Sequence, residues 1–255
     1  DADLVFVASD DGFLRALDLQ SGAVRWKRRG GPDGRRVLGN ERVISRWPVR
    51  GGPVVRDGVV YFVAGIWPSD GVFVHALDAP TGRTLWVEDE SGSLRMAQPH
   101  GGAEAESGVA AQGHLVASDE LLLVPTGRAV PAAFRRSDGA FEYYRLQSES
   151  PRGGTATMAS GKLFFNSGRF FDAKTGAAGG AAGSAGSAIA GLPDGIVTTS
   201  AKGLTVHRWQ ELEDGTRGLR PTLSVASVVA DRSLIVCSEQ AVAGGKGSLQ
   251  RVDLR

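Results

Sequence analysis

Residues 15–26 read RALDLQSGAVRW and residues 75–86 read HALDAPTGRTLW, and these two stretches decide the fold. Each runs from an apolar segment to an aspartate, passes through a short turn closed by glycine, and resumes as a strand that ends in tryptophan. Weaker copies follow at residues 132–143 (AAFRRSDGAFEY), 169–180 (RFFDAKTGAAGG) and 207–219 (HRWQELEDGTRGL), and RVDL at 251–254 begins another. A unit that recurs along a chain predicts a repeat architecture.

A second element lies between these copies and consists of two apolar runs joined by a tight turn. It occurs at residues 54–63, 115–124, 156–165, 189–199 and 228–237. Aspartate and glycine in such turns accept the backbone angles that match strand twist, so each pair of runs predicts a β-hairpin. Each repeat therefore has four strands: the hairpin, a third strand ending at the aspartate, and a fourth after the glycine.

The spacing of the turn glycines gives the architecture. Gly22, Gly82, Gly139, Gly176 and Gly215 lie 60, 57, 37 and 39 residues apart. The last two intervals are close to the roughly 40 to 45 residues of a four-stranded propeller blade. The sequence predicts an all-β fold, a β-propeller of four-stranded antiparallel blades with about six blade units visible. The first unit lacks its first strand and the last unit lacks its fourth, so the chain is either a window of a larger ring or closes with one irregular blade.

Blades of this size bury their faces only by stacking on their neighbours. The predicted core residues are Val59, Tyr61, Phe62, Leu121, Leu123, Leu163, Phe165, Ile196, Leu234 and Val236. Trp26 and Trp86 are expected to hold the fourth strand of one blade against the next blade, because large aromatic side chains in a repeat serve packing.

Three segments do not fit the strand pattern of a single domain spanning residues 1–255. Residues 28–50 and 88–112 explain the two long intervals and are expected to be loop insertions on one face of the ring, where binding often occurs. Residues 176–188 consist of Gly, Ala and Ser and predict a flexible connection.

Charge and composition exclude several classes of protein. Lys and Arg number 29 against 28 Asp and Glu, which argues against nucleic acid as a partner. The single cysteine, Cys237, excludes an internal disulfide framework. Apolar runs fall far short of the roughly 20 residues that cross a bilayer, so no transmembrane segment is expected. The chain opens with Asp1 almost directly before a strand, which suggests a part of a longer multidomain chain.

The pattern A-L-D-x-x-[ST]-G-x-x-x-W at Ala16–Trp26 and Ala76–Trp86 resembles the repeat of pyrroloquinoline-quinone-like (PQQ-like, quinoprotein-type) β-propellers. The resemblance is partial at Ala133–Tyr143 and Phe170–Gly176. It implies blades of a ring that commonly has eight, in an extracytoplasmic, periplasmic or cell-envelope setting of bacterial type. Members include quinoprotein dehydrogenases and non-catalytic scaffold lipoproteins of outer-membrane assembly.

The dehydrogenases of this family use PQQ near a vicinal cysteine pair, together with a calcium ion. This chain has one cysteine, so the vicinal pair is absent and no cofactor is expected. Calcium stays open, because the EDE run at Glu88–Glu90 offers oxygen atoms of the type that calcium binds, and the alternative is a solvated acidic loop. No catalytic residues are assigned. His100, between Pro99 and Gly101 and followed by Glu104 and Glu106, is the one histidine that is a candidate for a binding site.

The first insertion carries a local excess of six positive charges. Lys27, Arg28, Arg29, Arg35, Arg36, Arg42, Arg46 and Arg50 face only Asp33 and Glu41. Arginine suits the bidentate capture of carboxylate or phosphate, and a nearby tryptophan stacks on rings or sugars. The candidate ligand-binding residues are Arg35, Arg36, Arg46, Trp47, Arg50, Trp67 and His100. The alternative is simple charge balance against the acidic residues 88–106.

These features favour a non-catalytic binding or scaffolding module for a protein, an anionic small molecule or a polysaccharide. The alternative is a quinoprotein-type oxidoreductase, or the recognition domain of a larger multidomain enzyme.

Overall fold

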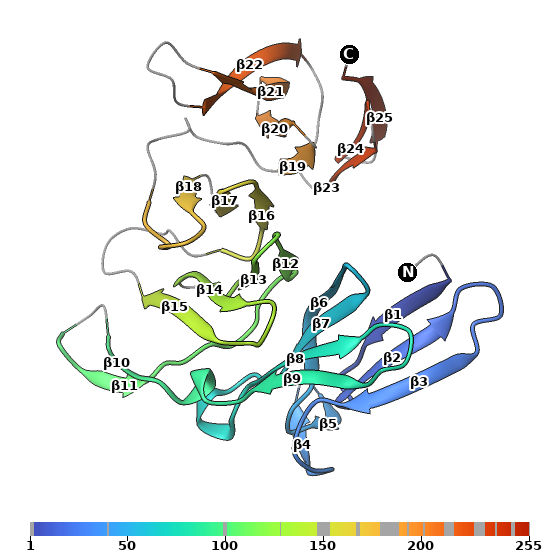
Figure 1. Ribbon diagram of the computed structural model, residues 1–255, viewed down its shortest axis with the longest axis vertical. Coiled ribbons are helices and arrows are strands. Elements are labelled where there is room, and N and C mark those ends of the chain that lie inside the picture. Colours follow the sequence, from blue (N-terminus) through green and yellow to red (C-terminus); the bar gives the residue numbers. More distant parts are fainter. Residues whose placement is uncertain are drawn as a thin grey trace. The chain divides into compact units, whose positions relative to one another are not determined.

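In the computed structural model, β-strands make up the regular structure of the described residues, apart from two short 3-10 helices (Figure 1). The described residues are 3–39, 41–98, 101–127, 129–146, 154–166, 169–178, 189–192, 194–200, 202–211, 217–226, 233–237, 239–245 and 248–254. Within them, no helix has the length and apolar character needed to cross a lipid bilayer.

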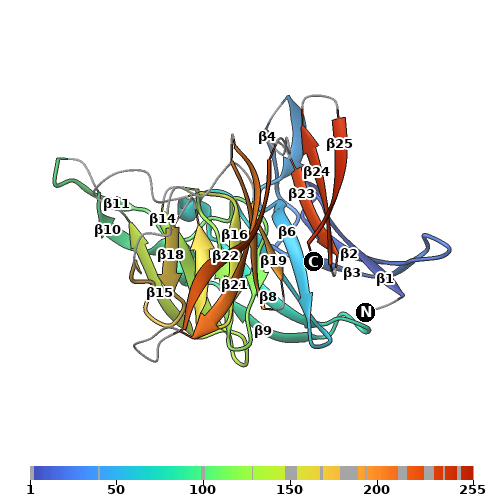
Figure 2. The ribbon, with the colours of Figure 1, turned by 90° about the horizontal axis from the view of Figure 1, so that it is seen from above.

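Six antiparallel sheets of three or four strands follow one another along the described chain, and each sheet consists of strands consecutive in sequence. Figure 2 shows the strands of one such sheet, β1, β2 and β3, side by side. This is the arrangement that the repeat predicts, and it confirms an all-β fold of antiparallel blades. The first and last of these sheets have three strands each, as predicted for incomplete terminal units.

The chain divides into two compact units, the first of which comprises residues 1–157 and 173–177. Its three larger sheets are β1 (Leu4–Ala8), β2 (Phe13–Asp18) and β3 (Val24–Arg29); β6 (Val49–Arg56), β7 (Val59–Ala64), β8 (Phe73–Asp78) and β9 (Thr84–Glu88); and β12 (Val116–Ala117), β13 (Leu121–Val124), β14 (Ala129–Arg135) and β15 (Phe141–Leu146).

The second unit comprises residues 158–172 and 178–255. Its sheets are β16 (Thr157–Ser160), β17 (Leu163–Asn166) and β18 (Arg169–Asp172); β19 (Ile189–Leu192), β20 (Gly195–Ser200), β21 (Gly203–Glu211) and β22 (Arg217–Ala226); and β23 (Ser233–Cys237), β24 (Gln240–Gly245) and β25 (Ser248–Asp253). The sheet that begins with β16 has three described strands where the repeat predicts four, and an isolated bridge joins Phe171 to Ala178. Most of the predicted Gly/Ala/Ser connection and the turn at Gly215 lie outside the described residues.

The two insertions differ from the loops that the sequence predicts. The first contains a two-stranded sheet, β4 (Arg36–Gly39) and β5 (Arg42–Ser45). The second contains the strands β10 (Arg95–Ala97) and β11 (Glu104–Glu106), preceded by the 3-10 helix η2 (Ser91–Ser93). In the sequence of the first insertion, Gly39 and Asn40 lie between the apolar pairs of RVLG and RVIS, which is a hairpin signal outside the period of the repeat.

The predicted core is found inside the sheets. Tyr61, Phe62, Leu123, Phe165 and Ile196 are buried, and the other five predicted core residues are half-buried. In the first unit, one apolar cluster joins the sheet β6–β9 to the sheet β12–β15, with Tyr61 and Phe134 among its largest side chains. The sheets therefore pack face to face, as blades do.

Aromatic residues of the fourth strand tie successive repeats together, as predicted. The indole nitrogen of Trp26 on β3 donates a hydrogen bond to the carbonyl oxygen of Ala79, at 3.0 Å, in the turn after β8. Trp86 on β9 donates to the carbonyl of Arg136 at 2.9 Å, and the hydroxyl of Tyr143 on β15 donates to the carbonyl of Ala173 at 2.7 Å. The third repeat has Tyr143 where the first two have tryptophan, and Tyr143 makes the equivalent contact.

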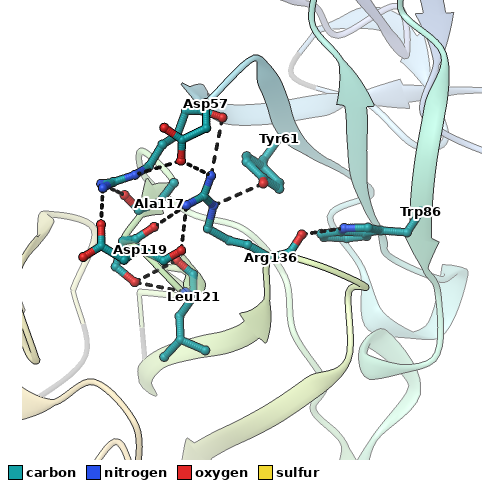
Figure 3. Close-up of polar contacts among 9 residues, drawn as sticks. Asp57, Tyr61, Trp86, Ala117, Asp119, Leu121 and Arg136 are labelled. Atoms are coloured by element: carbon teal, nitrogen blue, oxygen red, sulfur yellow. Dashed lines mark hydrogen bonds and ion pairs between the residues drawn. The ribbon is translucent and has the colours of Figure 1, made fainter.

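Arg136 makes a second link between the sheets β6–β9 and β12–β15 (Figure 3). Its guanidinium donates to the hydroxyl of Tyr61 at 3.1 Å and pairs with Asp57 at 2.9 Å. It also donates to the carbonyls of Ser118 and Asp119, each at 2.8 Å. A single half-buried guanidinium thus joins two turns and one ring from neighbouring repeats.

Candidate binding site

The first insertion begins at a buried contact with the second sheet of its unit. His75 on β8 is almost fully buried, and its ring stacks on Phe62 with 4.4 Å between the ring centroids and 4° between the planes. The His75 Nε2 lies 2.8 Å from the carbonyl oxygen of Gly30. Because a carbonyl only accepts, Nε2 carries the proton in the neutral ring. His75 is therefore a blade residue, as the sequence indicates, and it holds the chain where the insertion leaves β3.

Burial of His75 makes the stability of the first unit sensitive to acid. Desolvation lowers the pKa of His75 to about 4, against smaller opposing effects of the Gly30 carbonyl and Asp89. In the unfolded chain, the imidazole of His75 binds a second proton near pH 6.5, whereas in the folded chain it does so only near pH 4. The free energy of unfolding is therefore greatest above pH 6.5 and falls as the pH drops towards 4. At pH 5 the loss relative to pH 7.5 is expected to be about 2 kcal/mol.

The variant His75→Gln provides the comparison, because glutamine keeps an N–H donor for Gly30 and does not titrate. Urea unfolding of both proteins at pH 7.5 and pH 5 measures the difference. An equal pH dependence in the two proteins would show that His75 is not the group responsible.

Four arginines of the insertion pair with nearby carboxylates, and none of these carboxylates belongs to residues 88–106. Arg35 pairs with Asp33 at 2.8 Å, Arg46 pairs with Asp70, and Arg50 and Arg42 both pair with Asp10, the former at 3.1 Å. Burial raises the pKa of Asp10, but the hydrogen bonds from the two guanidinium groups outweigh burial and hold the pKa below its usual value. For these four arginines, the alternative that acidic residues 88–106 balance their charge is therefore wrong.

Trp47 lies in the core of the insertion and not on its surface. Its side chain is 2% exposed, its indole nitrogen donates to the carbonyl of Asp70 at 2.7 Å, and its ring meets Phe73 edge-on. The guanidinium groups of Arg35 and Arg46 lie 5.0 and 5.7 Å from the centre of the ring. The expectation that Trp47 is available to stack on a ligand does not match this placement, since the protein covers its ring.

The other predicted site residues do not form one cluster with Trp47. Trp67 is 46% exposed and precedes the 3-10 helix η1 (Pro68–Asp70), whose Asp70 connects it to Arg46. Arg50 belongs to β6 and is held by Asp10. His100 lies outside the described residues. The structure therefore brings together Arg35, Arg46 and Trp47, and places Arg36 with a different set of residues.

That different set is the outer face of the β4–β5 hairpin, which the sequence analysis did not identify. Leu38 and Val43 lie opposite each other on the two strands and are 84% and 59% exposed. Arg36 follows on the same face, paired in register with Ser45. We call Arg36, Leu38 and Val43 the hairpin face. The signal in the sequence is the pair of adjacent apolar residues in RVLG and in RVIS, because neighbouring residues of a strand point to opposite faces.

A cavity of about 520 Å³ lies beside the hairpin face. Its lining includes Arg36, Val43 and Ser45 of the hairpin, together with Asp10 and Asp11 of the turn between β1 and β2. Asp11 pairs with Arg15, and this contact together with nearby backbone and serine hydrogen bonds holds the pKa of Asp11 at about 2. The carboxylates of the cavity are thus already engaged by arginines.

The acidic run at Glu88–Glu90 serves the local backbone. The carboxylate of Glu88 accepts hydrogen bonds from the amides of Glu90 and Ser91, at 3.0 and 2.7 Å, and from the hydroxyl of Ser91 at 2.6 Å. Across the described part of the chain, no group of three or more His, Cys, Asp or Glu side chains is placed to hold a metal ion.

Comparisons with known proteins agree with this architecture. A family model described as "Outer membrane protein assembly factor BamB" matches residues 1–109. The outer membrane protein assembly factor BamB of Xanthomonas campestris is 37% identical over 91 residues, which are 35% of this chain and 20% of that protein.

Two solved structures share the fold at low sequence identity. BamB from Moraxella catarrhalis matches 98% of this chain and 66% of its own, with a TM-score of 0.56 and 16% identity. The dihydro-heme d1 dehydrogenase NirN matches 99% of this chain and 51% of its own, with a TM-score of 0.59 and 15% identity. The chain thus spans less than two thirds of these relatives. The sheets and these matches show that the chain has a β-propeller fold, and that residues 1–109 are similar to the outer membrane protein assembly factor BamB.

Proposed function

We propose that the chain is a non-catalytic protein-binding propeller of the bacterial cell envelope that takes part in the assembly of other proteins. The observation that carries this proposal is the hairpin face. The family model of an outer-membrane assembly factor matches residues 1–109, and Leu38 and Val43 lie exposed within that stretch. Exposed apolar side chains beside a cation are typical of a surface that binds another protein.

We further propose that the chain works without PQQ and without calcium. Quinone chemistry in this family uses a vicinal cysteine pair, and this chain has a single cysteine. Glu88, within the run that offers oxygen ligands, has both carboxylate oxygens engaged by Glu90 and Ser91. These residues do not fit the quinone and calcium site, so we derive no redox step.

One experiment separates the two classes of function. The tagged chain is crosslinked in its native cells, the captured envelope protein is identified, and both proteins are purified and mixed. We expect a complex of defined stoichiometry by size-exclusion chromatography with light scattering. In parallel, the chain is incubated with PQQ and calcium and assayed for dye-linked alcohol oxidation. Turnover with a bound quinone, or failure of the purified pair to associate, would overturn the proposal.

A further inference from the structure

The hairpin face combines three properties that together describe a peptide-binding edge, and the first is its sidedness. Leu38 and Val43 are strongly exposed, whereas Ile44, on the opposite face of the same two strands, is 2% exposed. The hairpin therefore rests on the protein through one face and presents an apolar pair on the other. An exposed cross-strand apolar pair gains free energy when another chain covers it.

The second property is an open backbone edge on β4. Opposed residues in an antiparallel pair alternate between those that exchange hydrogen bonds and those that do not. Arg46 donates its amide to the carbonyl of Arg35, whereas Ser45 donates its amide outwards to Asp10. The alternation then turns the amides and carbonyls of Arg36 and Leu38 away from β5, and within the described residues no backbone partner for them is seen.

The opposite edge of the hairpin is covered at Ser45. The amide of Ser45 on β5 donates to the carbonyl of Asp10 at 2.8 Å, so the turn between β1 and β2 covers that side. Beside β4, by contrast, Arg36 and Leu38 both turn their amides and carbonyls outwards, so we place an added third strand there. An open strand edge is a template for pairing with an extended segment of another chain.

The third property is charge. The other basic residues of the run each contact a described group: Arg35, Arg42, Arg46 and Arg50 pair with carboxylates, Arg28 and Arg29 donate to carbonyls, and Lys27 lies over the ring of Phe13. Among the described residues, Arg36 is the member of the run without such a partner. It also borders the cavity, which leaves space for an acidic side chain beside it.

We propose that the edge of β4 binds an extended segment of a protein partner by strand addition. The residue of that segment opposite Leu38 is apolar, and the residue opposite Arg36, two positions away and on the same face, is acidic. Backbone hydrogen bonds to Arg36 and Leu38 supply affinity, and the apolar and acidic side chains supply specificity. This inference rests on the proposed function and adds to it the binding edge and the sequence pattern of the partner.

The test uses fluorescein-labelled Thr-Glu-Thr-Val-Thr, which has the acidic-x-apolar pattern, and measures its fluorescence anisotropy with the full chain. We expect saturable, salt-sensitive binding. Arg36→Gln should weaken it about tenfold, because a charge-assisted hydrogen bond is lost. Leu38→Ser combined with Val43→Ser should weaken it by about the same factor through lost apolar contact. A peptide with Lys in place of Glu, and one N-methylated along its backbone, should not bind.

Matched controls are Arg95→Gln and Leu85→Ser, because both side chains are exposed and lie on other strands. They should leave peptide binding within about twofold of the original, the variation expected of surface changes outside the site. Equal binding of the Glu and Lys peptides, or equal affinity of the Arg36→Gln variant and the original chain, would overturn the inference.

The purified envelope partner separates this inference from the proposed function. If the chain with Arg36→Gln, Leu38→Ser and Val43→Ser still binds that partner with unchanged affinity, the β4 edge is not the docking site and the proposed function stands. If the unaltered chain binds no partner, the proposed function fails. Circular dichroism verifies that each variant is folded.

Discussion

Replacing Arg136 by alanine is expected to lower the free energy of unfolding of the first unit by about 3 kcal/mol, because the change leaves the oxygen atoms of Tyr61 and Ser118 without a donor and removes the packing of a largely covered side chain. The side chain of Arg136 is 10% exposed and donates to Tyr61, Ser118 and Asp119. Its ion pair with Asp57 contributes little to this figure, since the carboxylate is 72% exposed. The loss comes mainly from the oxygen atoms left without a donor between two sheets.

Arg135 provides a matched control one residue away. Its guanidinium pairs with Asp138 and Glu142 on the surface and is 49% exposed, so Arg135→Ala is expected to leave the free energy of unfolding close to that of the original chain. Urea unfolding followed by tryptophan fluorescence measures both variants, because four of the five tryptophans, at positions 26, 47, 67 and 86, belong to the first unit. Equal losses for the two variants would contradict the role assigned to Arg136.

The contacts of Arg136 also explain how the sheet β6–β9 is joined to the sheet β12–β15. Trp86 docks on the carbonyl of Arg136, while the side chain of the same residue reaches back to Tyr61 (Figure 3). The Tyr61 and Trp86 rings lie 5.9 Å apart. The backbone and the side chain of Arg136 thus hold the second and fourth strands of the previous repeat, β7 and β9, which couples the stability of the two sheets.

The repeat made most of the fold predictable from the sequence. Turn aspartates, turn glycines and the aromatic residues at 26, 86 and 143 are local signals, and each reports a strand boundary or a contact with the next repeat. The strand order and the docking of Trp26 and Trp86 were therefore accessible before the structure.

The binding site was less predictable, because its contacts connect residues far apart in sequence. Arg42 and Asp10 are an ion pair, yet no periodic pattern relates them. The charge excess of the insertion suggested a large anion-binding surface, whereas Asp10, Asp33 and Asp70 pair with four of its arginines. Trp47 was expected on the surface because it lies among charged residues, but its neighbours in space are Phe73 and the Asp70 carbonyl.

The turn glycines offer a second large effect, because two of them occupy the same position of the repeat in different surroundings. Gly22 and Gly82 have φ angles of 69° and 67°. A Cβ at Gly22 would meet no atom within 4 Å, whereas a Cβ at Gly82 would lie 2.6 Å from the ring of Trp26. Alanine at either position adds the strain of the left-handed conformation, but only at Gly82 does it displace a docked indole.

Gly22→Ala is therefore expected to lower the free energy of unfolding by about 1 kcal/mol, the strain of alanine in the left-handed region. Gly82→Ala is expected to lower it by about 3 kcal/mol, because overpacking against Trp26 adds to that strain. It should also shift the Trp26 emission to longer wavelength as the hydrogen bond to Ala79 opens. Urea unfolding and emission spectra of both variants measure these effects. Similar losses at the two glycines would show that the aromatic contact does not hold successive repeats together, and the packing argument for this fold would then lose its strongest support.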